Sequence, residues 1–144
     1  MREIKYQAWL HDEKQMVNVI EINTFDKYIR YYDISHCQDD AEIFDFIRSN
    51  LPNADCGFEG CDLRQYTGLK DKNGKEIYEG DIVRISNHPF DGSIEVNRNY
   101  EVGYNSEMEL CCGSWLLFRM RHYAEVIGNV FEHPELLEVE EAEQ

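Results

Sequence analysis

The sequence predicts a mainly β, or β-rich α+β, protein made of antiparallel sheets with an SH3-like small barrel, an N-terminal β-hairpin and one short amphipathic helix. Three observations carry this prediction. Residues Glu3–Leu10 alternate in polarity and are followed by a β-branched run, which is typical of paired strands. The dipeptide Asn73-Gly74 is a strong hairpin signal. The run Ile82–Ile85 has the composition of a sheet strand.

The first two strands form the predicted hairpin. Glu3–Leu10 and Met16–Ile22 are separated by the polar turn His11–Lys14. Trp9 lies on the second face of the first strand, where it either packs against a neighbour or marks a ligand site; we favour packing. A third strand, rich in tyrosine, is expected over Lys27–Tyr32.

Residues Asp39–Asn50 form the one convincing helix. Asp39 or Asp40 can serve as the N-cap, and acids in the first turn complement the helix dipole. An apolar stripe at helical spacing includes Ile43, Phe46 and Ile47 and is widened by Phe44 and Leu51. The dipeptide Leu51-Pro52 ends the helix, and a loop is expected over Asn53–Gly60.

The stretch Leu63–Ile85 organises the rest of the chain. We expect a type I′ turn at Asn73-Gly74, because both of its central positions need positive φ. Asp71, Lys72 and Lys75 are expected to line a solvated loop. The acids around Gly74 do not match an EF-hand, whose glycine is the sixth residue of the loop.

A second reversal follows at Glu79-Gly80-Asp81. In this position Asp81 is expected to cap free backbone N–H groups, and the alternative of a catalytic acid is less favoured. Structural turn roles are therefore assigned to Asn73, Gly74, Gly80 and Asp81.

The remaining strands are expected to close the same sheet. A loop over Ser86–Ser93 precedes one or two strands over Ile94–Tyr104. The dense apolar run Trp115–Met120 predicts a central strand. Ala124–Phe131 predicts another, with a bulge or bend at Gly128, and His133–Leu137 a short helical turn.

Three segments resemble the YopX family of phage proteins. They are MREIKYQAWLHDEKQMV at the start, QYTGLKDKNGKEIYEGDIV in the centre and EVIGNVFEHPELL near the end, within Met1–Val19, Leu63–Ile85 and Glu125–Leu137. The resemblance implies a small, mostly β, self-associating protein encoded by phages or prophages of low-GC Gram-positive bacteria, and it assigns no activity. Asp39–Asp62 departs from the expected short connection and is interpreted as a family-variable insert.

We therefore expect three parts. Residues 1–62 hold the hairpin and the helical insert, residues 63–137 hold the SH3-like barrel with the family motif, and residues 138–144 form a disordered acidic tail.

The negative charge of the chain bears on whether its partner is nucleic acid or protein. The chain has a formal net charge of −15, and the segment Asp39–Asp62 holds seven acids against the single Arg48. Binding to nucleic acid depends on basic residues that release counterions, so no direct nucleic-acid binding is expected. Acidic blocks are ordinarily solvated faces. The more specific alternative is that these acids mimic DNA and occupy the nucleic-acid groove of a host protein.

The sequence contains no membrane span and no signal peptide, which predicts the cytoplasm of a bacterial host. Its five cysteines are then expected to be free thiols. Cys56 and Cys61, and the adjacent pair Cys111-Cys112, lack the spacing of a zinc knuckle, so neither metal nor cofactor is expected.

No catalytic signature is present. The five histidines are scattered, and among them His122, beside Arg121 and Tyr123, is the best candidate for a pocket, although a surface position is favoured. Nucleophile elbows, phosphate-binding glycine loops and dinucleotide fingerprints are missing. The chain is therefore predicted not to be an enzyme.

The resulting hypothesis is a self-associating, non-enzymatic protein-interaction module that binds a phage or host protein. The alternative is an acidic, DNA-mimicking inhibitor of a host nucleic-acid-binding or defence enzyme. The candidate interaction surface has an aromatic part and an acidic part. Its residues are Trp9, Tyr28, Tyr31, Tyr32, Asp39, Asp40, Glu42 and Asp45.

Overall fold

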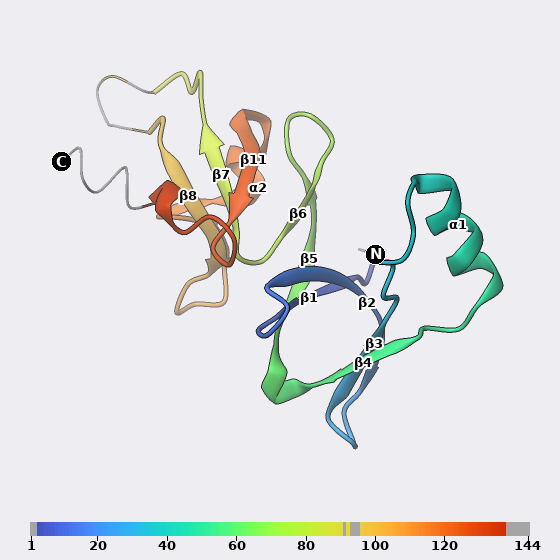
Figure 1. Cartoon of the computed structure of the whole chain (residues 1–144). Helices are drawn as coiled ribbons and strands as arrows, with labels where there is room; N and C mark the ends of the chain where they lie inside the picture. The colour runs from blue at the N-terminus through green and yellow to red at the C-terminus, as the bar shows by residue number, and fades with distance from the viewer. Residues whose placement is uncertain (1–2, 91, 93–95, 138–144) are drawn as a thin grey trace. The chain divides into compact units, whose positions relative to one another are not determined.

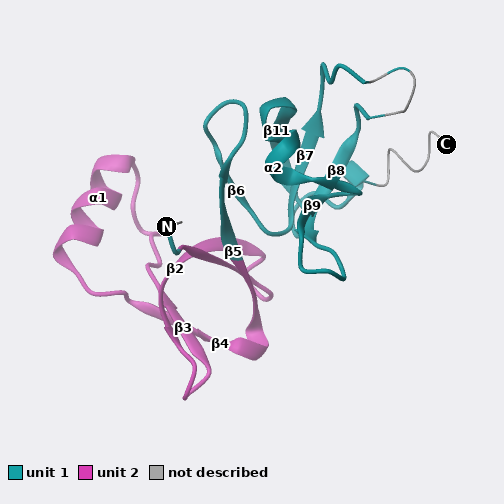
Figure 2. Ribbon diagram, turned by 180° about the vertical axis from the view of Figure 1, so that it is seen from behind, with its two compact units in different colours: residues 1–4, 65–144 teal, residues 5–64 magenta. Residues whose placement is uncertain are grey.

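The computed structural model describes residues 3–90, 92 and 96–137. The chain divides into two compact units (Figure 2). Unit 2 is Lys5–Arg64, and unit 1 is Gln65–Gln144 together with Met1–Ile4. The division lies two residues beyond the expected boundary, and it falls inside a continuous strand instead of a linker. Of the expected tail, residues 138–144 lie outside the described part of the chain.

Unit 2 is a curved antiparallel sheet with one helix (Figure 1). The strand order is β4-β3-β2-β1-β5, and β5 continues into unit 1. The elements are β1 (Tyr6–Leu10), β2 (Gln15–Asn23), β3 (Tyr28–Tyr31), α1 (Asp40–Ser49), β4 (Ala54–Gly57), the 3-10 turn η1 (Phe58–Gly60) and β5 (Cys61–Lys70).

The predicted N-terminal hairpin is present, with Ala8 opposite Val17 and Trp9 opposite Met16. Strand alternation places Ala8 and Leu10 in the core of unit 2, where they pack with Ile29. The core of this unit is small, which is consistent with the short strands that supply it.

The expected loop over Asn53–Gly60 is wrong. Residues Ala54–Gly57 form strand β4, which pairs along β3, and Phe58–Gly60 form η1. The polar, glycine-containing sequence concealed the strand because only Cys56 of β4 packs against the core.

Unit 1 contains the second sheet, with strand order β10-β9-β8-β7-β11. All its described pairings are antiparallel, so the mainly β, antiparallel fold is confirmed, but the sheet does not close into a barrel. The elements are β6 (Glu76–Tyr78), β7 (Asp81–Ile85), β8 (Asn99–Tyr104), β9 (Leu110–Cys112), β10 (Trp115–Leu116), α2 (Leu117–Met120), the 3-10 turn η2 (Arg121–Tyr123) and β11 (Ala124–Asn129).

The central strand expected over Trp115–Met120 is also wrong. Only Trp115–Leu116 are extended, at the edge of the sheet, and the chain then turns into α2. Leu117 and Met120, three residues apart, are buried on one side of this turn. A short apolar run fits both the two-residue period of a strand and the 3.6-residue period of a helix. Here the residues after Leu116 form a helix.

The hairpin between β5 and β6 differs from a type I′ turn. Gly74 has a φ of +84°, but Asn73 is not among the described residues with positive φ. Strand β5 ends at Lys70 and β6 begins at Glu76, so the loop between them is longer than two residues. The later bulge prediction agrees with the structure, since β11 shifts register against β7 between Val126 and Gly128.

Candidate functional site

The aromatic residues of the candidate surface do not form one exposed face. Tyr31 packs against the core of unit 2, and its burial raises the pKa of its hydroxyl above the usual value. Trp9 and Tyr28 are half-buried. The Tyr28 hydroxyl accepts a hydrogen bond from Asn23 Nδ2 at 3.3 Å. These side chains serve mainly to hold the sheet.

Tyr32 has a different role, because it holds helix α1. Its hydroxyl donates a hydrogen bond of 2.7 Å to the carbonyl oxygen of Asn50, directly after the helix. Its ring meets Phe46 edge to face at 6.1 Å, and the His36 ring lies 4.5 Å from Phe46. Phe46 is thus the apolar anchor of the helix.

The acidic residues of the candidate surface begin α1. Asp39 is the N-cap, as expected, and its carboxylate accepts from the Glu42 N–H at 2.9 Å. The Glu42 carboxylate in turn accepts from the Gln38 N–H at 2.8 Å. This reciprocal pattern resembles a capping box. Asp39, Asp40, Glu42 and Asp45 are all exposed.

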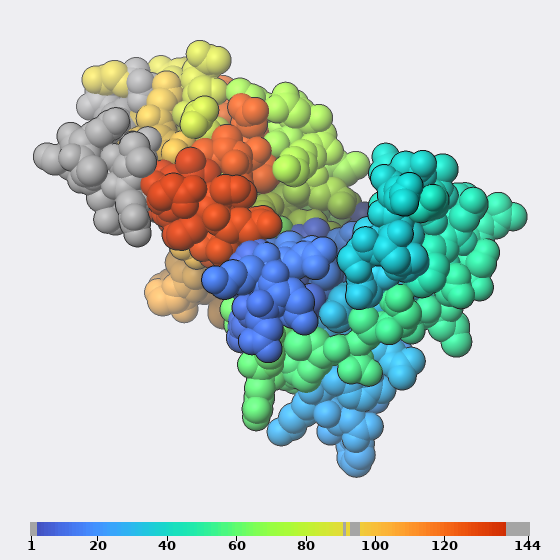
Figure 3. Space-filling model, viewed as in Figure 1, coloured from blue at the N-terminus to red at the C-terminus, as the bar shows by residue number. Residues whose placement is uncertain are grey.

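No residue of α1 is buried. The exposed fraction is 64% for Phe44, 41% for Ile47 and 83% for Leu51, which follows the helix. The space-filling view shows side chains of the segment that contains this helix, coloured teal, on the visible face (Figure 3). The helix therefore presents apolar and acidic side chains together. The sequence pattern identified the apolar stripe but did not show that Phe44 and Leu51 are exposed.

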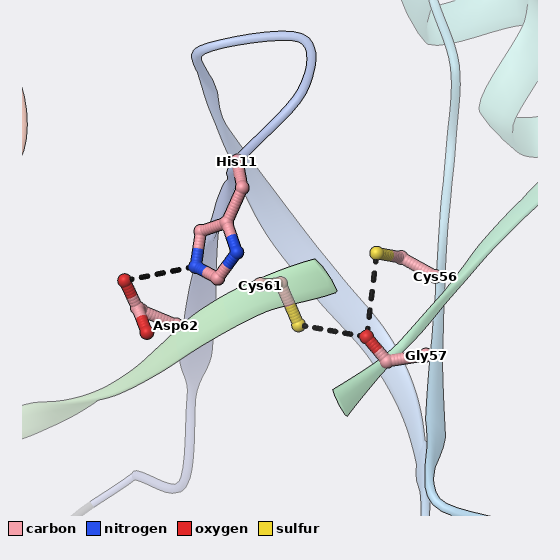
Figure 4. A network of polar contacts seen from close by, with 5 residues as sticks. All are labelled: His11, Cys56, Gly57, Cys61 and Asp62. Atoms are coloured by element: carbon pink, nitrogen blue, oxygen red, sulfur yellow. Dashed lines mark hydrogen bonds and ion pairs between the residues drawn. The ribbon is translucent and has the colours of Figure 1, made fainter. Parts of the chain in front are cut away.

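A second polar cluster lies at the end of unit 2 where β5 begins (Figure 4). The Sγ atoms of Cys56 and Cys61 lie 3.4 and 3.6 Å from the same acceptor, the carbonyl oxygen of Gly57. His11 Nε2 lies 3.1 Å from Asp62 Oδ2. Burial raises the pKa of Cys61 to about 11 and also raises that of Cys56, so both thiols are protonated at neutral pH.

The cluster does not have the geometry of a metal site. Among the described residues, no group of three or more His, Cys, Asp or Glu side chains could hold a metal ion. We interpret the cluster as packing of the β4–β5 connection.

The turn residues of unit 1 lie where strands reverse. Asp81 is buried, and its Oδ2 accepts from the Tyr78 N–H at 2.8 Å. Gly80 has a φ of +83°. The expected solvated position of Asp71 is wrong, because its side chain is buried with 7% exposure. Its Oδ1 accepts from the Asn73 and Lys75 N–H groups, and its Oδ2 from Val126 N–H.

Unit 1 also carries a groove that the sequence did not predict. It has a volume of about 500 Å3 and lies between residues 88–90 and 115–123. Only His122 had been considered for a pocket, and it does line this one. The available signal was the mixture of aromatic residues and arginine in WLLFRMRHY, which the strand interpretation concealed.

No helix in the described part of the chain has the length and apolar character needed to cross a membrane.

Comparison with known proteins identifies a family and a solved structure of similar fold. The model of the family described as YopX protein matches residues 5–138. The crystal structure of protein EF1440 from Enterococcus faecalis is similar with a TM-score of 0.63 at 24% identity, over 95% of this chain and 99% of that one. At that identity the likeness concerns the fold alone. The search of curated proteins found no match.

Proposed function

The chain belongs to the YopX protein family, and from that premise we propose that it is a non-enzymatic protein-interaction module that associates with itself. The element that makes the contact is helix α1. As part of the same proposal, the protein is encoded by a phage or prophage and acts in the cytoplasm of the bacterial host.

The exposure of α1 carries this proposal. Isolated helices shorter than about 12–15 residues are marginal in water, and α1 spans Asp40–Ser49. It is held by its caps, by the Tyr32 hydrogen bond and by the anchor Phe46. These contacts leave Phe44 and Ile47, which are three residues apart and neighbours on the helix surface, in solvent.

Such a helix has the form that partner grooves recognise. In helix-in-groove binding, apolar anchors at positions i, i+3 or i+4 and i+7 enter a hydrophobic cleft. Phe44 and Ile47 have the i, i+3 spacing, and the exposed Leu51 lies just beyond the end of the helix. Complete burial of each side chain contributes about 1.5–3 kcal/mol. The helix therefore has enough exposed apolar surface to support association.

The alternative function is an acidic inhibitor that mimics nucleic acid. It is favoured by the seven acids between Asp39 and Asp62, of which those on α1 are exposed. The apolar side chains among these acids favour the interaction module, because a phosphate mimic has no need of them. Replacing the acids by D40N, E42Q and D45N would abolish capture of a host nucleic-acid enzyme by an inhibitor, whereas F44S/I47S would not.

The first test compares sedimentation velocity of the wild-type chain with that of the variant F44S/I47S. We expect the wild type to associate as concentration rises, and the variant to be weakened by about 100-fold or more, which corresponds to about 3 kcal/mol of lost apolar burial. Phe25 is 91% exposed, so F25S is a matched control and should associate as the wild type does. Equal association of F44S/I47S and wild type would contradict the proposal.

A further inference from the structure

The groove on unit 1 has an unusual electrostatic character for this protein. Its lining includes two arginines, two histidines and no acid, although the chain has a formal net charge of −15. Its charged, polar and aromatic lining residues include His88, Phe90, Phe118, Arg119, Arg121 and His122. A cationic surface of this kind attracts an anionic partner.

The groove is also apolar and aromatic. Phe90 and Phe118 are 69% and 63% exposed. The His88 ring lies 4.8 Å from the Tyr123 ring and 5.5 Å from the Phe90 ring. These ring contacts are made within the chain itself, and contacts formed before binding reduce the entropy lost on binding.

The cation at the groove is held in place as well. The Arg121 guanidinium carbon lies 4.8 Å from the centre of the Phe118 ring, a cation–π geometry. Arg121 Nε is buried without a hydrogen-bond partner among the described residues. Arg119 is exposed beside it. The partner should therefore combine carboxylates with apolar anchors.

Helix α1 has that combination. Phe44 and Ile47 are exposed anchors, and Asp40 and Asp45 are exposed acids on the same helix. Nucleic acid also offers negative charge, but its phosphate backbone has no aliphatic side chains to fill the apolar part of the groove. Both the charge and the apolar character of the groove thus favour an acidic amphipathic helix.

We propose that the groove lined by residues 88–90, 115–116 and 118–123 binds helix α1 of a second copy of this chain. This inference rests on the proposed function and names the surface that receives the helix. Phe44 and Ile47 enter between Phe90 and Phe118, and the carboxylates of α1 face Arg119 and Arg121. Such a contact joins unlike surfaces, so repetition around a rotation axis gives a closed ring, and a pair of reciprocal contacts gives a dimer.

The test is a complementation experiment between two defective variants. The variant F44S/I47S lacks the helix anchors and keeps the groove, and F118S/R119E lacks the groove contacts and keeps the helix. The substituted residues other than Ile47 are more than half exposed or on the open surface, so circular dichroism should match the wild type. As a control, R84E changes another exposed arginine of unit 1 and should leave association unchanged.

Each variant alone should remain monomeric at concentrations where the wild type associates. An equimolar mixture should form a 1:1 dimer and stop there, because only one intact helix can meet one intact groove. The sedimentation coefficient and light-scattering mass of the mixture give this result directly.

Four results would overturn the inference, and they separate it from the proposed function. If F118S/R119E associates as the wild type while F44S/I47S does not, the helix binds another surface and only the groove is wrong. If both variants lose association but the mixture stays monomeric, helix and groove do not meet. If both variants associate as the wild type, or the wild type is monomeric throughout, the proposed self-association through α1 is wrong as well.

Discussion

At the scale of single residues, the buried thiol of Cys112 links the fold to pH. Its side chain is fully buried in the core of unit 1, and burial raises the pKa of the thiol to about 12 from an ordinary value of 9.0. Below pH 9 the thiol is protonated in both the folded and the unfolded chain. Between pH 9 and about 12 only the unfolded chain loses the proton, so stability falls as pH rises.

Between pH 9 and about 12 we expect the unfolding free energy to fall less steeply with pH in C112A than in the wild type. The two slopes should differ by up to about 1.4 kcal/mol per pH unit. Urea unfolding at several pH values between 8 and 11 measures it. The slope is compared instead of the absolute stability, because C112A also leaves a cavity. C37A removes a half-buried thiol whose pKa is also raised, by burial and by the neighbouring Glu42 and Asp39, but not by a large shift as in Cys112. It should therefore change the slope less than C112A does. Equal slopes for C112A and wild type would refute the assignment.

At the scale of elements, Asp71 joins the β5–β6 loop to β11. One carboxylate oxygen accepts two N–H groups of the loop, at 2.8 and 2.9 Å, and the other accepts the N–H of Val126 at 2.9 Å. The backbone adds a bond from the Lys72 N–H to the carbonyl oxygen of Ala124. The buried carboxylate of Asp71 therefore joins the β5–β6 hairpin to β11 of the five-stranded sheet.

Replacing Asp71 by alanine leaves three N–H groups without their acceptor, so we expect D71A to lower the unfolding free energy on the order of 3 kcal/mol. Denaturant unfolding followed by tryptophan fluorescence measures the change. The exposed acid Glu107 in the same unit supplies the control E107A, which should stay within about 0.5 kcal/mol of the wild type. A D71A value within that same range would show that the bridge is not important for stability.

The elements show which parts of the fold the sequence could predict. Strands with regular alternation, such as Tyr6–Leu10, and the capped helix from Asp39 were predictable because local rules determine them. The burial of Asp71 was not, since it depends on the Val126 N–H, 55 residues away. Likewise, Leu116–Met120 could satisfy a strand or a helix, and only packing decides between them.

In the candidate site, too, the features set by local sequence were predictable and those set by tertiary packing were not. The acids of α1 were predictable as a helix start and are exposed there. The solvent exposure of Phe44 was not, because a sequence pattern shows that one face is apolar without showing what covers it. The groove was missed because residues 88–90 and 115–123 are brought together only by the tertiary fold of unit 1.

At the scale of the whole molecule, two compact units carry complementary surfaces. Unit 2 presents an acidic helix with exposed apolar side chains, and unit 1 presents a cationic aromatic groove. In the proposed assembly, each copy would contribute α1 to one contact and the groove to another. Such contacts between oppositely charged surfaces would offset part of the repulsion expected between copies of net charge −15.

The most direct test is photo-cross-linking from the helix. Benzoylphenylalanine replaces Phe44, and the protein is mixed with isotopically labelled copies so that links between copies are identified by mass. We expect links to peptides containing residues 88–90 or 115–123 of the other copy, and none from the same probe at Phe25. Links confined to the same copy, or to other segments of the partner, would contradict the docking of α1 in the groove.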